Sequence, residues 1–211
     1  MARVPDPPAQ LDLELEEWPN GRTIVRVYPA AYGPTSFNST TDQARFRPVY
    51  SSADAVVPTL YGSESFDAAI AETILHDLSA RWRKTVPFAR VRDRVQVELA
   101  PARTLQLAAF HGAGLQRTRL RRNQLIDTGP PTYPQTAKWG QKAWEHPERI
   151  DGIVWMSRQY DSQRAIMLFQ DRVEQRELNV IAGSLLPLDA GAGYELLARM
   201  VQRAGFRINR P

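Results

Sequence analysis

The stretch LYGSESFDAAIAETILHDL (60–78) constrains the fold of this 211-residue chain more than any other segment. It predicts a short strand ending at Tyr61, a polar turn, and a helix that begins near Ser65, which can cap its first turn. Apolar residues recur every four positions of this helix and form one stripe: Phe66, Ile70, Ile74 and Leu78. The stretch therefore predicts a strand followed by an amphipathic helix.

Glu72 lies off this stripe, on a helix face that it shares with Ala68, Leu75 and His76. Glutamates in the middle of a helix are usually solvated, and His76 is one turn away as a surface partner. From this stretch alone, Glu72 is therefore interpreted as a surface residue. The rest of the chain gives a reason to interpret it differently.

Composition narrows the possible chemistry. The chain has no cysteine, which excludes disulfides, thiol catalysis and thiolate metal sites. Its three histidines, at positions 76, 111 and 146, are isolated, so we expect no metal site. No apolar run has the length of a membrane span, and the N-terminus lacks a signal-peptide pattern, so we expect a cytoplasmic protein. The positive charge is nearly all arginine, which favours an anionic ligand.

We divide the chain into a lead-in segment, residues 1–21, and one domain, residues 22–211. The lead-in is rich in proline and acidic residues, and is expected to lie on the surface or to bind a partner. TIVRVY (23–28) predicts a strand in which Arg26 faces outward, unless an anion meets it inside. Residues 29–57 predict a long loop, which includes an exposed basic turn where Arg45 and Arg47 flank an anchoring Phe46.

The remaining segments predict further strands and two helices. Helices are expected over residues 133–145, with Trp139 and Trp144 in the core or a lid, and over residues 194–204. Strands or apolar segments are expected at residues 95–99, 103–108, 152–158, 165–169, 180–188 and 206–208. This order predicts a single α+β domain, in which a mixed or antiparallel sheet is flanked by helices.

Two nucleotide-binding motifs are absent from the chain, and the role of one basic run is undecided. Arg117 stands where a dinucleotide fingerprint would have its third glycine, and no phosphate-binding GK[ST] loop is present. The run HGAGLQRTRLRRNQ (111–124) contains four arginines, which could contact nucleic acid or form a solvated face. A basic nucleic-acid-binding module is therefore one alternative function.

Five segments, in order, resemble the RES domain family of bacterial toxins: VRVY (25–28), ARFRP (44–48), LYGSESFDAAIAE (60–72), YPQTAKWGQKAWE (133–145) and GIVWMSRQYDSQRAIMLF (152–169). The family is related to ADP-ribosyltransferase toxins, so the resemblance implies an ADP-ribosyltransferase-like fold. Its members attack NAD at the bond between nicotinamide and ribose. Some hydrolyse or phosphorolyse NAD, and others transfer ADP-ribose to a protein.

The resemblance implies a set of site residues. Glu72, Tyr61 and Arg26 are the expected catalytic residues, and Arg26, Arg45, Tyr61 and Ser157 are expected to bind NAD, which is the substrate. The ARFRP segment departs from the family pattern at Ala44 and Arg47, which leaves open whether Arg45 or Arg47 contacts the ligand. On residue type alone, Ser157 could equally end a strand by satisfying a nearby turn.

The resemblance also implies partners. We expect an antitoxin of the Xre type, contact with nucleic acid only through that antitoxin, and a possible homo-oligomer within the complex. The main hypothesis is an NAD-consuming toxin, and the alternative within the same chemistry is an ADP-ribosyltransferase with a protein target. His76 is expected to lie behind the site or on the surface.

Overall fold

The computed structural model describes residues 3–76, 78, 84–160 and 162–209. In this part of the chain, nine strands form one sheet. Eight of them follow one another across the sheet, and the ninth, β9, pairs with β5. From one edge the order is β1 (Leu15–Trp18), β6 (Leu105–Ala109), β7 (Gly152–Met156), β8 (Arg164–Phe169), β3 (Thr59–Ser63), β2 (Ile24–Pro29), β5 (Arg94–Pro101), with both β9 (Leu178–Val180) and β10 (Leu186–Pro187) paired to β5. The pairings are antiparallel except for β6 with β7, which are parallel.

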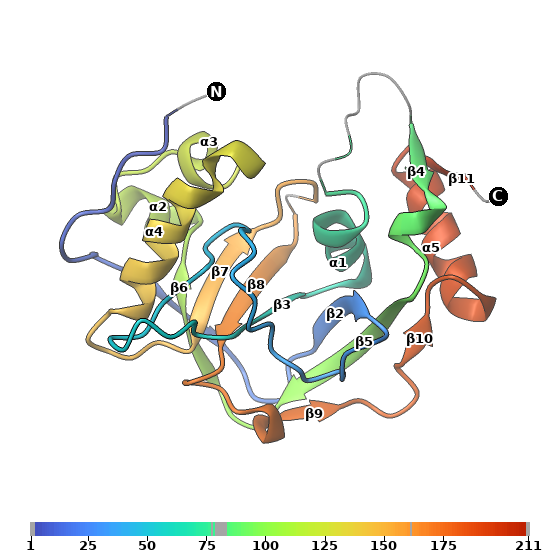
Figure 1. The fold of residues 1–211 in the computed structure, drawn as a ribbon, viewed down its shortest axis with the longest axis horizontal. Helices are drawn as coiled ribbons and strands as arrows, with labels where there is room; N and C mark the ends of the chain where they lie inside the picture. Colours follow the sequence, from blue (N-terminus) through green and yellow to red (C-terminus); the bar gives the residue numbers. More distant parts are fainter. Residues whose placement is uncertain (1–2, 77, 79–83, 161, 210–211) are drawn as a thin grey trace.

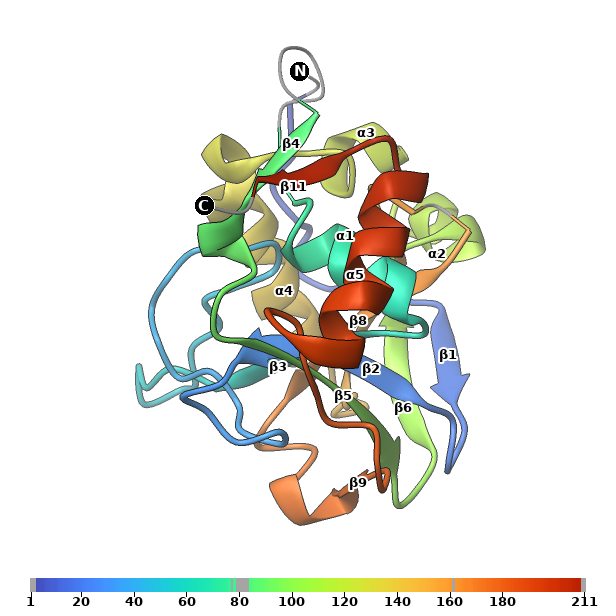
Figure 2. The same ribbon diagram turned by 90° about the vertical axis from the view of Figure 1, so that its right-hand side faces the viewer.

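The helices lie around this sheet (Figure 1). They are α1 (Phe66–Thr73), α2 (Gly112–Arg117), α3 (Arg122–Leu125), α4 (Tyr133–Trp144) and α5 (Gly191–Arg203). Figure 1 shows α2, α3 and α4 beside β6 and β7, and α1 and α5 at the other end of the sheet. A separate parallel pair, β4 (Thr85–Pro87) with β11 (Arg207–Asn209), lies next to α5 (Figure 2). The predicted α+β fold with a mostly antiparallel sheet is confirmed.

Three apolar clusters hold these layers together. One packs α4 and the loop around Phe46 against Trp155 of β7. A second lies on the other face of the sheet and includes Leu60 and Val154. The third joins α1 and α5 to β2 through Val25 and Val27. No helix within the described ranges has the length and apolar character that a membrane span requires.

A strand followed by a helix forms at residues 59–73 as predicted, although the strand ends at Ser63 instead of Tyr61 and the helix is shorter. Ser65 caps α1, because its hydroxyl accepts a hydrogen bond of 3.2 Å from the backbone N–H of Ala68. The helix ends at Thr73 rather than near Leu78. All four residues of the predicted stripe still pack in the third cluster, with Ile70 and Ile74 fully buried. The apolar face was therefore predicted correctly even though the end of the helix was not.

The N-terminal segment is part of the fold, contrary to the expectation of a surface lead-in. Residues 15–18 form the edge strand β1, and Val4, Leu11 and Leu13 are buried against the α4 cluster. Arg117 pairs with Asp12 at 2.5 Å and with Glu14 at 3.3 Å, so acidic residues of this segment neutralise part of the basic run. This use of Arg117 weakens the interpretation of residues 111–124 as a nucleic-acid surface.

Strands β2 and β3 diverge where the helix α1 crosses them. They are paired at a single position, Val25 with Ser63, whereas β2 pairs with β5 along its whole length from Ile24 to Pro29. Because α1 follows β3 directly and packs on Val25 and Val27, it lies over this divergence. The arrangement places residues of both strands and one face of α1 around the same space.

Candidate active site

A cavity of about 360 Å³ lies between α1, the diverging strands and the loop before β3. Its floor is apolar and is formed by Val25 and Val27 of β2, Ala69 of α1 and Ala165 of β8. Its polar lining includes six side chains from separate segments of the chain: Arg45, Arg47, Tyr61, Glu72, His76 and Tyr133. An apolar pocket with a few convergent polar groups is the usual form of a small-molecule site.

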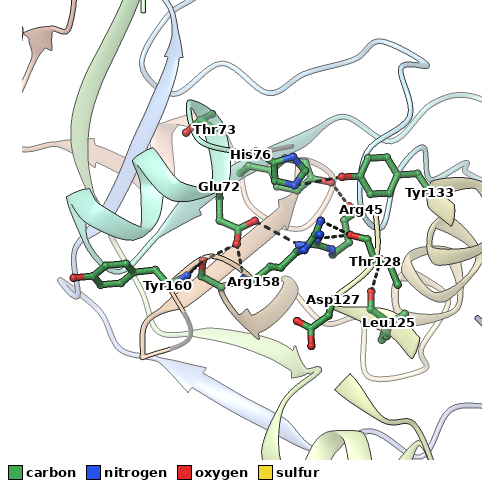
Figure 3. A network of polar contacts seen from close by, with 12 residues as sticks. Arg45, Glu72, Thr73, His76, Leu125, Asp127, Thr128, Tyr133, Arg158 and Tyr160 are labelled. Atoms are coloured by element: carbon green, nitrogen blue, oxygen red, sulfur yellow. Dashed lines mark hydrogen bonds and ion pairs between the residues drawn. The ribbon is translucent and has the colours of Figure 1, made fainter. Parts of the chain in front are cut away.

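Glu72 is the most strongly anchored of these groups (Figure 3). Its Oε1 accepts hydrogen bonds from the Ser157 hydroxyl at 2.6 Å and from the backbone N–H of Arg158 at 2.7 Å. Its Oε2 lies 3.4 Å from Nη1 of Arg45. The side chain is 13% exposed, so Glu72 is not a solvated surface residue. One carboxylate oxygen is fixed, and the other has only a long contact.

Arg45 and Arg47 are 3% and 5% exposed, so the expectation of an exposed basic turn is wrong. Phe46 between them is fully buried and has a left-handed backbone, with φ of 70°. A helix glycine makes this packing possible, because a Cβ at Gly140 would lie 2.1 Å from the Phe46 carbonyl oxygen. The predicted anchoring role of Phe46 is confirmed, and its burial carries both arginines into the protein.

The two arginines differ in how they are held. Arg47 donates from Nη2 to the carbonyl oxygen of Thr40 at 2.5 Å and to its hydroxyl at 3.1 Å. Arg45 has longer contacts, to Glu72 and to the carbonyl of Thr128, each at 3.4 Å. Within the described part of the chain, Nε of Arg45 is buried without a hydrogen-bond partner. Arg45 therefore retains the donor capacity that an anionic ligand could use.

Tyr61 presents its ring to the cavity and its hydroxyl to the loop that carries Arg45 and Arg47, here called the arginine loop. The hydroxyl donates to the backbone carbonyl of Arg45, which ties β3 to that loop. The ring meets Trp155 edge to face, with centroids 6.2 Å apart. Burial raises the pKa of Tyr61, against the opposing effect of Arg47 and Arg45, so the hydroxyl stays protonated and continues to donate.

Ser157 is fully buried at the end of β7 and does not line the cavity. Its hydroxyl donates to Glu72 and accepts a 3.1 Å hydrogen bond from the backbone N–H of Tyr160. Ser157 therefore satisfies the turn, as the second interpretation expects. It does not face the cavity as the expected NAD contact would, and it reaches the site only through Glu72. The turn itself is fixed, because Arg122 donates to the Ser157 carbonyl at 2.9 Å and Arg158 to the Thr128 carbonyl at 2.8 Å.

Arg26 is not brought to this cavity. Val25 and Val27 line it, and successive side chains of a strand point to opposite faces, so Arg26 lies on the other side of β2. It is 8% exposed rather than outward-facing, donates to the Pro34 carbonyl at 2.6 Å, and stacks over Tyr28. Burial lowers the pKa of Arg26 to about 10, so the guanidinium stays charged at neutral pH.

Two further residues of the cavity were not expected there. His76, predicted to lie behind the site or on the surface, lines the cavity, and its Nε2 is 3.3 Å from the Tyr133 hydroxyl (Figure 3). The spacing of four residues from Glu72 was the available signal for His76, because it places both on one helix face. Among the described residues, no group of three or more histidines and carboxylates could hold a metal ion.

Comparisons with known proteins identify the family of the chain and a similar fold. The family model described as RES domain matches residues 23–189, which is most of the chain. Curated proteins give no match. A chain in the crystal structure of the M. tuberculosis MbcT–MbcA toxin-antitoxin complex is similar in fold, with a TM-score of 0.58 and 14% sequence identity, over 79% of this chain and 84% of that one.

Proposed function

The chain belongs to the RES domain family, and from this premise we propose that it is a toxin that cleaves the bond between nicotinamide and ribose in NAD. The observation that carries the proposal is the fixed orientation of the Glu72 carboxylate beside the cavity. Its Oε1 is fixed by Ser157 and the Arg158 N–H, and its carboxylate borders a cavity that also contains buried arginine. The negative charge of Glu72 suits the part of a ligand that becomes cationic during the reaction. The positive charge of the buried arginine suits the anionic part of the same ligand.

Breaking the nicotinamide–ribose bond builds positive charge on the ribose, as in glycoside hydrolysis. A carboxylate that is already oriented stabilises that charge without reorganising at the moment of reaction. We assign this role to Glu72, with Ser157 and the Arg158 N–H holding it in place. Two short hydrogen bonds on Oε1 leave Oε2 as the oxygen that faces the ribose.

The remaining groups fit the other parts of NAD. The guanidinium of Arg45, whose Nε has no hydrogen-bond partner among the described residues, can donate to phosphate oxygens, for which arginine is suited. The ring of Tyr61 and the floor of Val25 and Val27 can hold a flat, cationic nicotinamide. At about 360 Å³ the cavity is near the lower end of ligand pockets, so we place the nicotinamide ribose inside it and the adenosine outside. Arg26 has no part in this arrangement.

The biological setting is part of the same proposal. The similar solved chain belongs to a toxin-antitoxin complex, and by analogy we expect an antitoxin here, of the Xre type that pairs with this family. Contact with nucleic acid would be made only through that antitoxin, and the complex could contain several copies of this chain. The proposed reaction takes place in the cytoplasm, uses NAD as substrate and requires no metal ion.

The experiment is to incubate the purified chain with NAD that carries a label in the adenylate half. Release of nicotinamide with the label in small molecules supports NAD consumption, and the Glu72→Gln variant serves as the inactive control. Label that becomes attached to protein would instead favour the alternative, an ADP-ribosyltransferase, since both reactions use the same ribose carbon. NAD that stays intact with the wild-type chain, both with and without phosphate and in the absence of antitoxin, would refute the proposal.

A further inference from the structure

Two titratable side chains line the cavity without a role in the proposed stabilisation of charge. His76 follows Glu72 by four positions, just after α1 ends, and Tyr133 is the first residue of α4. Figure 3 shows the two side chains facing each other. Nε2 of His76 lies 3.3 Å from the Tyr133 hydroxyl. Their rings are tilted by 38°, with centroids 6.4 Å apart. They are therefore hydrogen-bonded through their polar atoms.

The pair is held from both sides. Arg90 donates from Nη1 to the backbone carbonyl of His76 at 2.7 Å, which fixes the turn after α1. Tyr133 is 5% exposed, and its helix packs closely on the Arg45 loop through the contact of Gly140 with Phe46. Side chains that meet from two fixed elements keep their geometry when a ligand enters, which a proton-transfer group needs.

The proposed reaction needs a group that Glu72 does not supply. A neutral acceptor such as water must lose a proton as its oxygen bonds to the ribose carbon. Glu72 already accepts hydrogen bonds from Ser157 and the Arg158 N–H and lies beside Arg45, an arrangement suited to holding a fixed negative charge. The proton therefore needs another acceptor, and within the cavity an imidazole is the side chain best suited to that task.

We propose that Tyr133 and His76 form a proton relay that activates the attacking water, an inference that rests on the proposed function. The water oxygen bonds to C1′ of the ribose as the bond from C1′ to nicotinamide breaks, and the electron pair of that bond goes to the nicotinamide nitrogen. One water proton passes to the Tyr133 oxygen while the Tyr133 proton passes to Nε2 of His76. The imidazolium then returns its proton to solvent, leaving ADP-ribose and nicotinamide.

The test compares water with azide as the acceptor. Azide is an anionic nucleophile without a proton, so its attack on C1′ needs no base. Nicotinamide release is measured with and without azide for the wild type, His76→Gln and Tyr133→Phe, with thermal unfolding to check folding. We expect each substitution to lower hydrolysis by roughly a hundredfold, while release in azide stays within a few-fold of the wild type and yields azido-ADP-ribose.

Glu72→Gln is the matched control, because it should lower nicotinamide release with both acceptors. Hydrolysis by folded His76→Gln and Tyr133→Phe at the wild-type rate would overturn the relay. Equal loss with water and with azide would overturn it too, since that result indicates a binding or structural role. Two variants on different elements keep the test valid if one of them fails to fold. If the wild-type chain cleaves NAD with neither acceptor, that result would refute the proposed function itself, and the relay along with it.

Discussion

The hydroxyl of Ser157 donates a 2.6 Å hydrogen bond to Oε1 of Glu72, and the two residues are 85 positions apart in the sequence. The bond joins the end of β7 to the face of α1 and fixes the rotation of the carboxylate. The backbone N–H of Arg158 donates to the same oxygen at 2.7 Å. Because two donors already bind Oε1, Oε2 is the oxygen that can contact a ligand.

Ser157→Ala should therefore lower turnover through Glu72 rather than through loss of a ligand contact. A hydrogen bond to a charged group is worth about 1.5–3 kcal/mol, so we expect turnover to fall roughly ten- to hundredfold, with little change in KM. The measurement is steady-state nicotinamide release by Ser157→Ala, Glu72→Gln and the double variant. If Ser157 acts through Glu72, the serine substitution should add almost nothing to Glu72→Gln. Fully multiplicative effects would show that Ser157 acts independently.

Arg45 and Arg47 should differ in their effect on turnover. Arg45 contacts Glu72 and has a buried Nε without a hydrogen-bond partner in the described residues, whereas Arg47 is held by Thr40. We expect Arg45→Ala to lose NAD turnover and Arg47→Ala to keep most of it. Arg199→Ala, at an exposed position of α5, is the control for loss of one positive charge. The opposite ranking would assign the ligand contact to Arg47.

Several parts of this site could be predicted from the sequence because their signals are local. Glu72 has a fixed position relative to the apolar stripe of its helix, and Ser65 marks where that helix begins. Tyr61 lies in a strand that the sequence predicts, although this strand runs on to Ser63 instead of ending at Tyr61. These residues are located by periodicity and capping, which need no knowledge of the rest of the fold.

Other parts depend on contacts between distant segments. Strand β2 is buried on both faces, so its sequence does not indicate which side faces the cavity, and the direction of Arg26 could not be read from it. The N-terminal segment has proline and acidic residues typical of a surface lead-in. Its partner Arg117 is 105 positions away from Asp12, and only the fold brings them together. The burial of Arg45 likewise depends on the close approach of α4 at Gly140.

Gly140→Ala should displace the loop that carries Arg45 and Arg47, although Gly140 itself does not line the cavity. The added Cβ would lie 2.1 Å from the Phe46 carbonyl oxygen, so α4 or the arginine loop must move. We expect a loss of stability of about 3 kcal/mol, which corresponds to a Tm lower by roughly 5–10 °C, together with reduced turnover. Gln135→Ala, at an exposed position of the same helix, should change neither quantity appreciably. An unchanged Tm in Gly140→Ala would show that this contact is not rigid.

The edge strand β1 should respond to acid through Glu16. Burial alone would raise the pKa of Glu16, but the hydrogen bond from His111 and the charge of Arg164 outweigh it, and the pKa is lowered. A carboxylate with a lowered pKa contributes stability above its unfolded pKa, about 4.3, and loses that contribution as the pH falls through the folded value. We therefore expect Glu16→Gln to lower Tm at neutral pH, by an amount that shrinks as the pH falls below about 4. Glu17→Gln, the exposed neighbour, is the control. A Tm difference independent of pH would contradict this account.

Glu72→Gln is the decisive change for the proposed chemistry. The amide keeps the size of the side chain and an oxygen that can accept from Ser157 and the Arg158 N–H, but it removes the negative charge. If that charge stabilises an oxocarbenium-like transition state, turnover should fall by at least roughly a hundredfold. NAD affinity should change far less, because the positive charge on the ribose develops mainly in the transition state. The measurement is NAD turnover, NAD binding and thermal unfolding of both proteins side by side. A folded Glu72→Gln variant whose turnover stays within a few-fold of the wild type would leave Glu72 with a structural role only.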